Sequence, residues 1–296
     1  MKNVSRAEKK EQAVFEYYRA VSDRLAAKID AREAESETRL IFSSVMQADI
    51  SRILGILWRE SMPDNDIAGI EAILKRRETG EPLQYILGET EFFGRVFMVT
   101  PAVLIPRHDT ECVIGAALHH VDASNGTEKL DVLDIGAGSG AICLTLALER
   151  PSRVEITAVD ISAAALAVAK MNAEMLGARV KFLVSDVFGA FAGTGIKFDI
   201  IISNPPYIRE NEYENLAREV KFEPVTALVA RDSGLEFYKR IIDGAFIYLK
   251  PGGALIFEIG YDMAPDIAKY AFDKGIMNSS IYYDIEKRPR GLKLWA

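Results

Sequence analysis

The first eighty residues alternate apolar and polar positions with the period of a helix. In the stretch "AVFEYYRAVSDRLAAKI", Val14, Tyr18, Val21 and Leu25 recur at spacings of three or four residues. This spacing predicts a helix with one apolar face. Apolar positions between residues 40 and 58 predict two further short helices, and Pro63 opens another one. We therefore expect residues 1–84 to form a small helical domain.

The pattern changes after residue 82 to aromatic and β-branched residues. The segment "LQYILGETEFFGRVFMVTPAVLIP" is interrupted by Gly88 and Gly94. Such a composition, broken by glycines, is typical of a β-hairpin. We expect residues 85–106 to form a β-hairpin linker between two domains.

From Leu130 onward, within an expected domain of residues 107–296, the chain shows a regular alternation of strand and helix patterns. Helices are predicted over 141–149, 163–176 and 235–249, between strands predicted at Leu130–Ile135, Val154–Val159, Val180–Val184, Phe198–Ile202 and Ala254–Ile259. This alternation predicts an α/β domain whose parallel sheet is covered on both faces. The chain ends in two β runs, residues 280–285 and 292–295. We expect them to add a C-terminal β-hairpin to a Rossmann-like sheet.

Composition and charge narrow the classes of function. The chain has 296 residues, of which 49% are apolar, and its apolar runs are shorter than the roughly 18 residues of a membrane helix. The first twenty residues lack the apolar stretch of a secretory signal, so we expect a cytoplasmic protein. A formal charge of −7 disfavours non-specific binding to the phosphate backbones of nucleic acids. Direct binding of nucleic acid and of membranes is therefore not expected.

The cysteines suggest neither a disulfide framework nor a metal site. Only Cys112 and Cys143 are present, which fits a reducing compartment. Cys112 precedes His119 and His120, but this spacing does not match common zinc sites. We predict no bound metal.

A glycine-rich loop follows the first predicted strand of the α/β domain. In "LDVLDIGAGSGAICLTLALE" the glycines are Gly136, Gly138 and Gly140. Glycines permit a positive φ and close approach of a ligand, and such sheets bind ligands at the carboxyl ends of their strands. The next strand ends at Asp160, which is placed to accept hydrogen bonds from ribose hydroxyls. A ligand that contains ribose is predicted, although such a loop can also be a plain turn.

Two cofactors fit this loop. The dinucleotide pattern G-x-G-x-x-G/A is satisfied, which is weak evidence for NAD. The alternative is S-adenosylmethionine, for which Asp134 begins a D-x-G-x-G-x-G pattern and offers a carboxylate to the ammonium of the donor, directly or through a water. Asp186 would meet the adenine amino group beside Val187, or would serve only as a turn or cap residue. The C-terminal hairpin favours S-adenosylmethionine.

The stretch "SNPPYI" follows the predicted strand Phe198–Ile202 at the same edge of the sheet. Pro205 restricts Asn204 to extended conformations, and Pro206 restricts Pro205 in the same way. The side-chain oxygen of Asn204 and the carbonyl of Pro205 can accept the two hydrogens of an amide or amino nitrogen and aim its lone pair at a methyl donor. Tyr207 would flank the planar target group. Alternatively, the stretch has only a structural role and forms an Asx-type turn at the end of the strand.

Motifs along nearly the whole chain resemble the HemK/PrmC family of protein-(glutamine-N5) methyltransferases, which modify peptide-chain release factors. The resemblance rests on "GEPLQYILGETEFFG", "VTPAVLIPRHDTE", "LDIGAGSGAICLTLA", "SNPPYI", "FEPVTALVA", "GLEFYKRII" and "EIG". It implies a class I release factor as the protein substrate, S-adenosylmethionine as the cofactor, and an N-terminal helical domain that helps to dock the factor. We further expect a monomer. His108 replaces a proline that is usual in this family.

The resemblance also implies roles for individual residues. The donor site would be formed by Asp134, Gly136, Ala137, Gly138, Ser139, Gly140, Asp160, Ile161, Asp186, Val187 and Asn204. The glutamine would be received by Asn204, Pro205, Pro206 and Tyr207, and Phe92 or Phe93 would close an apolar wall near the donor methyl. Arg107 and Glu111 would support this wall, or would form an ordinary surface ion pair.

The leading hypothesis is therefore methyl transfer to the glutamine of a Gly-Gly-Gln loop in a release factor. Within the same reaction type, Asn-Pro-Pro-Tyr also fits methylation of an adenine amino group in RNA or DNA. From other classes, a nicotinamide-dependent oxidoreductase and a non-catalytic protein that binds the cofactor remain alternatives.

Overall fold

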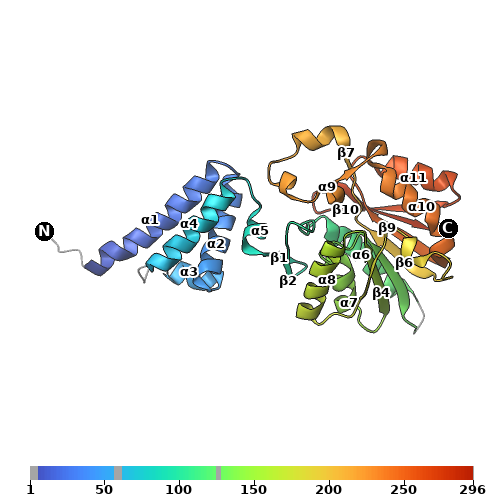
Figure 1. The fold of residues 1–296 in the computed structure, drawn as a ribbon, viewed down its shortest axis with the longest axis horizontal. Helices are drawn as coiled ribbons and strands as arrows, with labels where there is room; N and C mark the ends of the chain where they lie inside the picture. Colours follow the sequence, from blue (N-terminus) through green and yellow to red (C-terminus); the bar gives the residue numbers. More distant parts are fainter. Residues whose placement is uncertain (1–5, 57–61, 125–127, 296) are drawn as a thin grey trace. The chain divides into compact units, whose positions relative to one another are not determined.

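The computed structural model describes residues 6–56, 62–124 and 128–295, and the chain forms two compact units, Met1–Leu87 and Gly88–Ala296 (Figure 1). The first unit contains the predicted helical region. The hairpin that sequence patterns assign to a linker belongs to the second unit.

The first unit is built from helices around one apolar core (blue to cyan in Figure 1). Val21, Ile41, Phe42 and Ile70 are fully buried in it. α2 is longer than predicted, because its first turns carry polar residues that an apolar pattern does not reveal. Asp30 caps the helix by accepting a hydrogen bond from the Arg32 amide at 2.8 Å. Residues 57 and 58 of the predicted third helix lie outside the described residues. The helices are α1 (Arg6–Ala26), α2 (Ala31–Met46), α3 (Ile50–Ile56), α4 (Asp64–Arg77) and α5 (Leu83–Leu87).

The second unit contains a seven-stranded sheet within the described residues, in the order β10-β11-β9-β6-β3-β4-β5. β9, β6, β3, β4 and β5 run parallel, and β10 and β11 form the antiparallel C-terminal hairpin. This confirms the predicted Rossmann-like fold. The strands are β3 (Leu130–Ile135), β4 (Val154–Asp160), β5 (Lys181–Val184), β6 (Phe198–Ser203), β9 (Leu249–Glu258), β10 (Asn278–Tyr283) and β11 (Pro289–Trp295).

Helices cover both faces of this sheet (Figure 1). Successive strand residues point to opposite faces, so Val132 packs beneath one helical layer and Leu133 beneath the other. One layer consists of α6 (Thr110–Ala123), α7 (Ala141–Glu149) and α8 (Ala163–Leu176), and the other of α10 (Glu236–Tyr248) and α11 (Ala264–Asp273). α6 and α11 are absent from the prediction, whereas α7 and α8 have the predicted bounds.

The predicted hairpin is present but short. It comprises β1 (Glu89–Phe92) and β2 (Arg95–Met98), because α5 occupies the beginning of the predicted range. The buried Asn172 of α8 ties this hairpin to the sheet: its side chain accepts a hydrogen bond from the Met98 amide at 2.7 Å and donates to the Ser139 carbonyl at 2.9 Å.

A segment of short elements connects β6 to α10, and the sequence patterns do not predict it. It contains β7 (Ile208–Arg209), η2 (Glu210–Asn215), η3 (Val220–Phe222), α9 (Val225–Leu228), β8 (Val229–Ala230) and η4 (Asp232–Gly234); η1 (Gly189–Phe191) follows β5. We call residues 208–234 the connecting segment. Across the described part of the chain, no helix combines the length and apolar character needed to cross a membrane.

Candidate active site

A cavity of about 650 Å³ opens at the carboxyl ends of β3, β4 and β6, within the second unit. This volume lies in the range of small-molecule sites, and the position is where open α/β sheets bind ligands. Residues from the glycine loop, from the ends of β4 and β6 and from the connecting segment line it together with the segment Pro101–Pro106. Among the predicted residues, the lining includes Gly136, Ala137, Gly138, Ser139, Asp160, Ile161, Asp186, Val187, Asn204, Pro205 and Pro206.

The three glycines of the loop have different surroundings, although all have a positive φ of 79°, 54° and 86°. A Cβ atom on Gly138 would meet no atom within 4 Å, so this residue faces open space. A Cβ atom on Gly140 would lie 2.8 Å from Cδ1 of Leu144, and Gly140 does not line the cavity. Gly138 thus leaves room for a ligand, whereas Gly140 permits the tight start of α7.

Asp160 is held rigidly at the end of β4. Its Oδ2 accepts a hydrogen bond from the Gly138 amide at 2.9 Å, and its Oδ1 accepts one from the Ser162 amide at 2.8 Å. Ile161 follows it in the cavity wall and is 66% exposed. A fixed carboxylate next to an exposed apolar side chain suits a ribose diol attached to a flat base.

Asp186 and Val187 line the cavity beyond the end of β5. Val187 is buried, and Asp186 forms an exposed ion pair with Arg240 of α10 at 2.7 Å. The Asp186 carboxylate is therefore shared with a guanidinium, a partner that the sequence analysis does not anticipate.

Asp134 does not line the cavity, which disfavours the direct one of its two predicted modes of contact with the donor. It is completely buried below the glycine loop, where Oδ2 accepts a hydrogen bond from the Cys143 amide at 3.1 Å. Its Oδ1 has no hydrogen-bond partner among the described residues. Burial raises the pKa of this carboxyl to about 7. Asp134 supports the start of α7, because Cys143, whose amide donates to it, lies in the first turn of that helix.

The "SNPPYI" stretch faces the glycine loop across the sheet edge. Ser203, the last residue of β6, pairs with Ile135 of β3, and its hydroxyl donates to the Ile135 carbonyl at 2.6 Å. The backbone oxygen of Asn204 lies 4.0 Å from the position that a Cβ atom on Gly136 would take. The structure therefore brings the two motifs together.

The Asn204 side chain begins a chain of hydrogen bonds that sequence reasoning missed. Its Nδ2 donates to Oγ1 of Thr110 at 3.4 Å, and Oγ1 donates to Oε2 of Glu258 at 2.5 Å. Thr110 and Glu258 are both buried, and burial raises the pKa of Glu258 to about 7. A signal was present in the sequence, since Glu258 is a charged residue at the end of an otherwise apolar strand that reaches the same edge.

Three aromatic residues are not where the prediction places them, because none of them lines the cavity. Tyr207 packs against the core below α10, and a Cβ atom on Gly234 would overlap its carbonyl oxygen. Phe92 is 1% exposed and packs edge-on against Phe97 in the core, and Phe93 packs beside it at the hairpin turn with φ of 50°. Aromatic residues of a short hairpin are needed for its packing, so they are not free to form a wall.

The apolar wall is formed instead by Pro101, Ala102, Val103, Leu104 and Pro106. Glu223 fastens this wall to the connecting segment: the buried carboxylate accepts a hydrogen bond from the Ile105 amide at 3.0 Å and pairs with Arg107. Arg107 thus has the supporting role expected of it. Glu111 does not pair with Arg107, as the ion-pair alternative expected; its carboxylate lies 3.1 Å from His108 at the surface.

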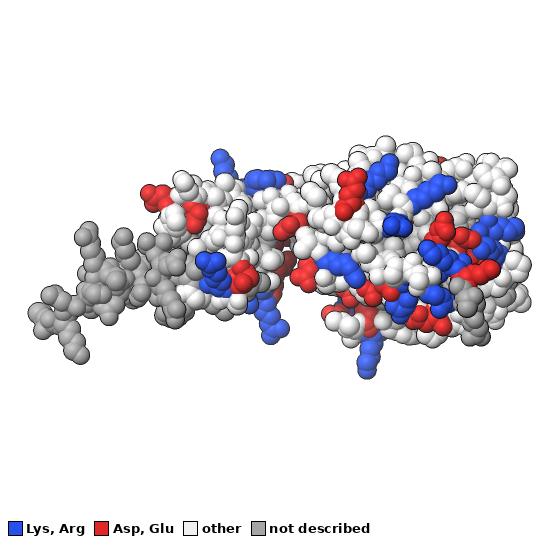
Figure 2. Space-filling view, turned by 90° about the horizontal axis from the view of Figure 1, so that it is seen from below, with Lys and Arg blue, Asp and Glu red and all other residues white. Residues whose placement is uncertain are grey.

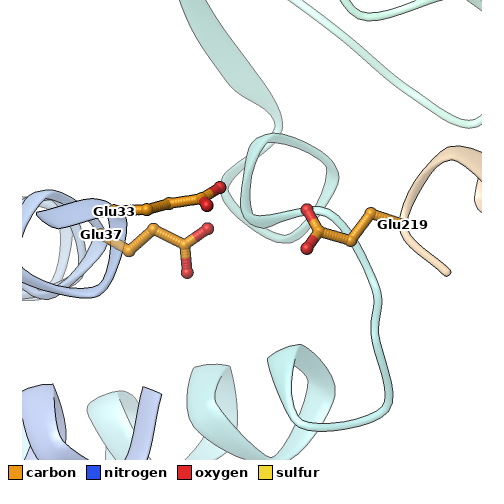
Figure 3. A group of neighbouring side chains, drawn as sticks. All are labelled: Glu33, Glu37 and Glu219. Carbon is orange, nitrogen blue, oxygen red and sulfur yellow. The ribbon is translucent and has the colours of Figure 1, made fainter. Parts of the chain in front are cut away.

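No metal site is assigned. Figure 3 shows Glu33 and Glu37, one turn apart on α2, with Glu219. Glu37 already pairs with Arg77 at 2.8 Å, and Glu219 belongs to the other unit. Burial raises the pKa of the Cys112 thiol to about 11, which disfavours the thiolate that a metal needs.

Residues 16–88 match the family described as PrmC N-terminal domain, and residues 116–229 match the methyltransferase small domain. The chain is 41% identical over 266 residues to a release factor glutamine methyltransferase of Koribacter versatilis, covering 90% of this chain and 91% of that protein. The chain belongs to the release factor glutamine methyltransferase family. This membership confirms the predicted family and enzyme class, and contradicts the oxidoreductase alternative.

Further similarities agree with this assignment. A release factor glutamine methyltransferase of Bacillus subtilis is 42% identical over 77% of this chain and 79% of its own length. Among solved structures, a T. thermophilus 16S rRNA methyltransferase in complex with AdoMet and guanosine has a TM-score of 0.51 and 20% identity, covering 70% of this chain and 49% of that chain. At this identity, the structural similarity supports the fold alone.

Proposed function

We propose that this protein transfers a methyl group from S-adenosylmethionine to the side-chain amide nitrogen of the glutamine in the Gly-Gly-Gln loop of class I peptide-chain release factors. The observation that carries the proposal is the meeting of the glycine loop and "SNPPYI" at one cavity in a chain of this family. A site for the donor and two acceptors for an amide nitrogen are thereby combined.

The cavity fits the donor. The open space at Gly138 admits the amino-acid tail, the fixed Asp160 carboxylate suits the ribose hydroxyls, and Ile161 and Val187 offer apolar contacts to adenine. Asp186 is the proposed partner of the adenine amino group. When bound, S-adenosylmethionine supplies an electrophilic methyl group on a sulfonium.

The protein contributes orientation and electrostatics to the transfer. We assign to Oδ1 of Asn204 and the carbonyl oxygen of Pro205 the two hydrogens of the substrate amide, so that its nitrogen lone pair turns toward the methyl. Both acceptors also stabilise the positive charge that develops on nitrogen as the methyl arrives. Pro206 keeps the Pro205 carbonyl fixed. Tyr207, which packs below this turn, supports it from the core.

The protein substrate accounts for the two-unit organisation. We propose that residues 1–84 help to dock the release factor, and that the enzyme acts in the cytoplasm as a monomer. Lys and Arg side chains are intermingled with Asp and Glu side chains on the face of the second unit drawn in Figure 2. This distribution supports a protein substrate more than a nucleic-acid backbone, which requires clustered positive charge.

A labelling assay tests the proposal directly. The purified enzyme, tritiated S-adenosylmethionine and a class I release factor should give a labelled factor, and replacing the loop glutamine of the factor should abolish the label. Label retained by the glutamine variant would contradict the proposed target. Transfer to RNA or DNA but not to the factor would favour the adenine alternative.

The role of Asn204 is tested in the same assay. Asn204→Ala should lower kcat by on the order of 100-fold, because one preorganised polar contact to the transition state is lost. Asn278→Ala is a matched control, since Asn278 is exposed on β10 and does not line the cavity. It should keep full activity. An Asn204→Ala enzyme as active as the control would disprove the assigned role.

A further inference from the structure

The chain of hydrogen bonds from Asn204 to Glu258 has a consequence for which end of an amide faces the cavity. Thr110 lines the cavity at the start of α6, and Glu258 lies behind it at the end of β9. A threonine hydroxyl has a single hydrogen. In this structure that hydrogen is donated to Oε2 of Glu258 at 2.5 Å, so Oγ1 can offer Asn204 only a lone pair.

The two ends of an asparagine amide have nearly the same shape but opposite hydrogen-bonding character. Rotation by half a turn would replace the acceptor oxygen in the cavity by an NH₂ group. That group would point its hydrogens at those of a substrate amide. The site would then lose one of the two acceptors that orient the nitrogen lone pair.

We propose that Thr110 and Glu258 are positioning residues that fix the Asn204 side chain with its oxygen toward the substrate, an inference that rests on the proposed methyl transfer. Thr110 accepts the Nδ2 hydrogen, which keeps the donor end of the amide away from the substrate. Glu258 sets the direction of this chain of hydrogen bonds by accepting the hydrogen of the Thr110 hydroxyl.

The burial of Glu258 agrees with a directional role. A carboxyl group that is 2% exposed is costly unless its oxygens are hydrogen-bonded. A carboxylate only accepts hydrogen bonds, so it sets the direction of the whole chain without ambiguity. A protonated Glu258 carboxyl could instead donate to Thr110, which would permit every hydrogen bond between Glu258 and Asn204 to run in the opposite direction.

The surroundings of Glu258 set the pH at which this reversal occurs. The pKa of Glu258 is raised to about 7, mainly by burial and in part by Asp109, whereas Thr110, Arg290 and Asn204 favour the charged form. The remaining titratable groups that face it are Cys112 on α6, Tyr207 after β6 and Tyr238 on α10. We expect kcat to fall as pH falls through about 7, and Glu258→Gln to flatten this part of the profile.

A double-mutant cycle tests the inference. Thr110→Val should lower kcat about tenfold, the value of one lost hydrogen bond, with little change in the dissociation constant of S-adenosylhomocysteine. Thr110→Ser retains the hydroxyl and should restore most of the rate. In an Asn204→Ala background, Thr110→Val should have no further effect, because residues that act through one another are not additive.

Thr145→Val is the matched control. Thr145 is also buried on a helix of the second unit, but its hydroxyl has no hydrogen-bond partner among the described residues. It should retain wild-type kcat. An equal fold loss from Thr110→Val in the wild-type and Asn204→Ala backgrounds would overturn the inference. A wild-type enzyme that does not methylate the factor would instead refute the proposed function.

Discussion

The glycine loop gives a prediction that separates folding from ligand binding. Gly138 and Gly140 both have a positive φ, so alanine at either position costs roughly 1 kcal/mol of stability through backbone strain. Their neighbours differ, because a Cβ atom on Gly138 meets nothing within 4 Å, whereas one on Gly140 lies 2.8 Å from Leu144 and 3.4 Å from Cβ of Ala169. Gly140→Ala therefore adds an overpacking cost of about 2 kcal/mol.

These costs translate into measurable shifts. A change of 1 kcal/mol moves the Tm of a unit of this size by about 2–4 °C. Gly138→Ala should lower the Tm of the ligand-free protein by about 2–4 °C, and Gly140→Ala, at about 3 kcal/mol, by about 6–12 °C. The added methyl of Gly138→Ala enters the cavity and should weaken S-adenosylhomocysteine binding by about tenfold, or 1.4 kcal/mol.

Circular dichroism melts and titration calorimetry check both expectations. Gly177→Ala is a suitable control, since Gly177 also has a positive φ of 68° with no atom near its Cβ position, and it lies at the end of α8 outside the cavity. It should share the small Tm loss but bind normally. Equal Tm losses for Gly138→Ala and Gly140→Ala, or normal binding by Gly138→Ala, would show that the assigned geometry of the loop is wrong.

Further predictions concern Asp134, Phe92 and the number of methyl groups transferred. Burial raises the pKa of Asp134 from 3.8 to about 7, so the folded state retains a proton that the unfolded state releases. The free energy of unfolding should therefore fall by on the order of 4 kcal/mol as pH rises from 4 to 7. Urea titrations should show a smaller fall for Asp134→Asn. Phe92→Ala should cost about 3–5 kcal/mol of stability but leave the dissociation constant of S-adenosylhomocysteine unchanged in calorimetry. Weaker binding would show that Phe92 does contribute to the cofactor site. A monomethylated amide has one N–H for the two acceptors at Asn204 and Pro205, so mass spectrometry should find a single added methyl, and ready dimethylation would contradict the two-acceptor arrangement.

The sheet of the second unit could be predicted because its parallel strands are short segments rich in apolar residues and bounded by clear turns. α7 and α8 have the predicted bounds for the same reason, since Gly140 and Gly177 mark a beginning and an end. α6 was missed although Val113, Ala117 and Val121 repeat every four residues and are buried. The connecting segment could not be predicted, because long-range contacts such as that between Glu223 and Ile105 hold its short elements.

The candidate site was predictable where its residues follow directly after a parallel strand. Gly136, Asp160 and Asn204 meet for this reason alone, since the carboxyl ends of neighbouring strands share an edge. Asp134, Tyr207 and the two phenylalanines depend instead on which way each side chain points, and packing decides this. The hydrogen bond between Thr110 and Glu258 could not be predicted, because 148 positions separate the two residues in the sequence.

The geometry of the acceptors also locates the source of substrate specificity. The two acceptors proposed at Asn204 and Pro205 would suit any planar nitrogen with two hydrogens, and both glutamine and adenine provide one. Discrimination must therefore come from groups that contact the rest of the substrate. Within the second unit, the cavity wall beyond the acceptors is formed by Pro224, Val225 and other residues of the connecting segment. We therefore expect that exchanging the connecting segment between relatives would change the preferred target more than the chemistry, although this segment is the least predictable part of the second unit.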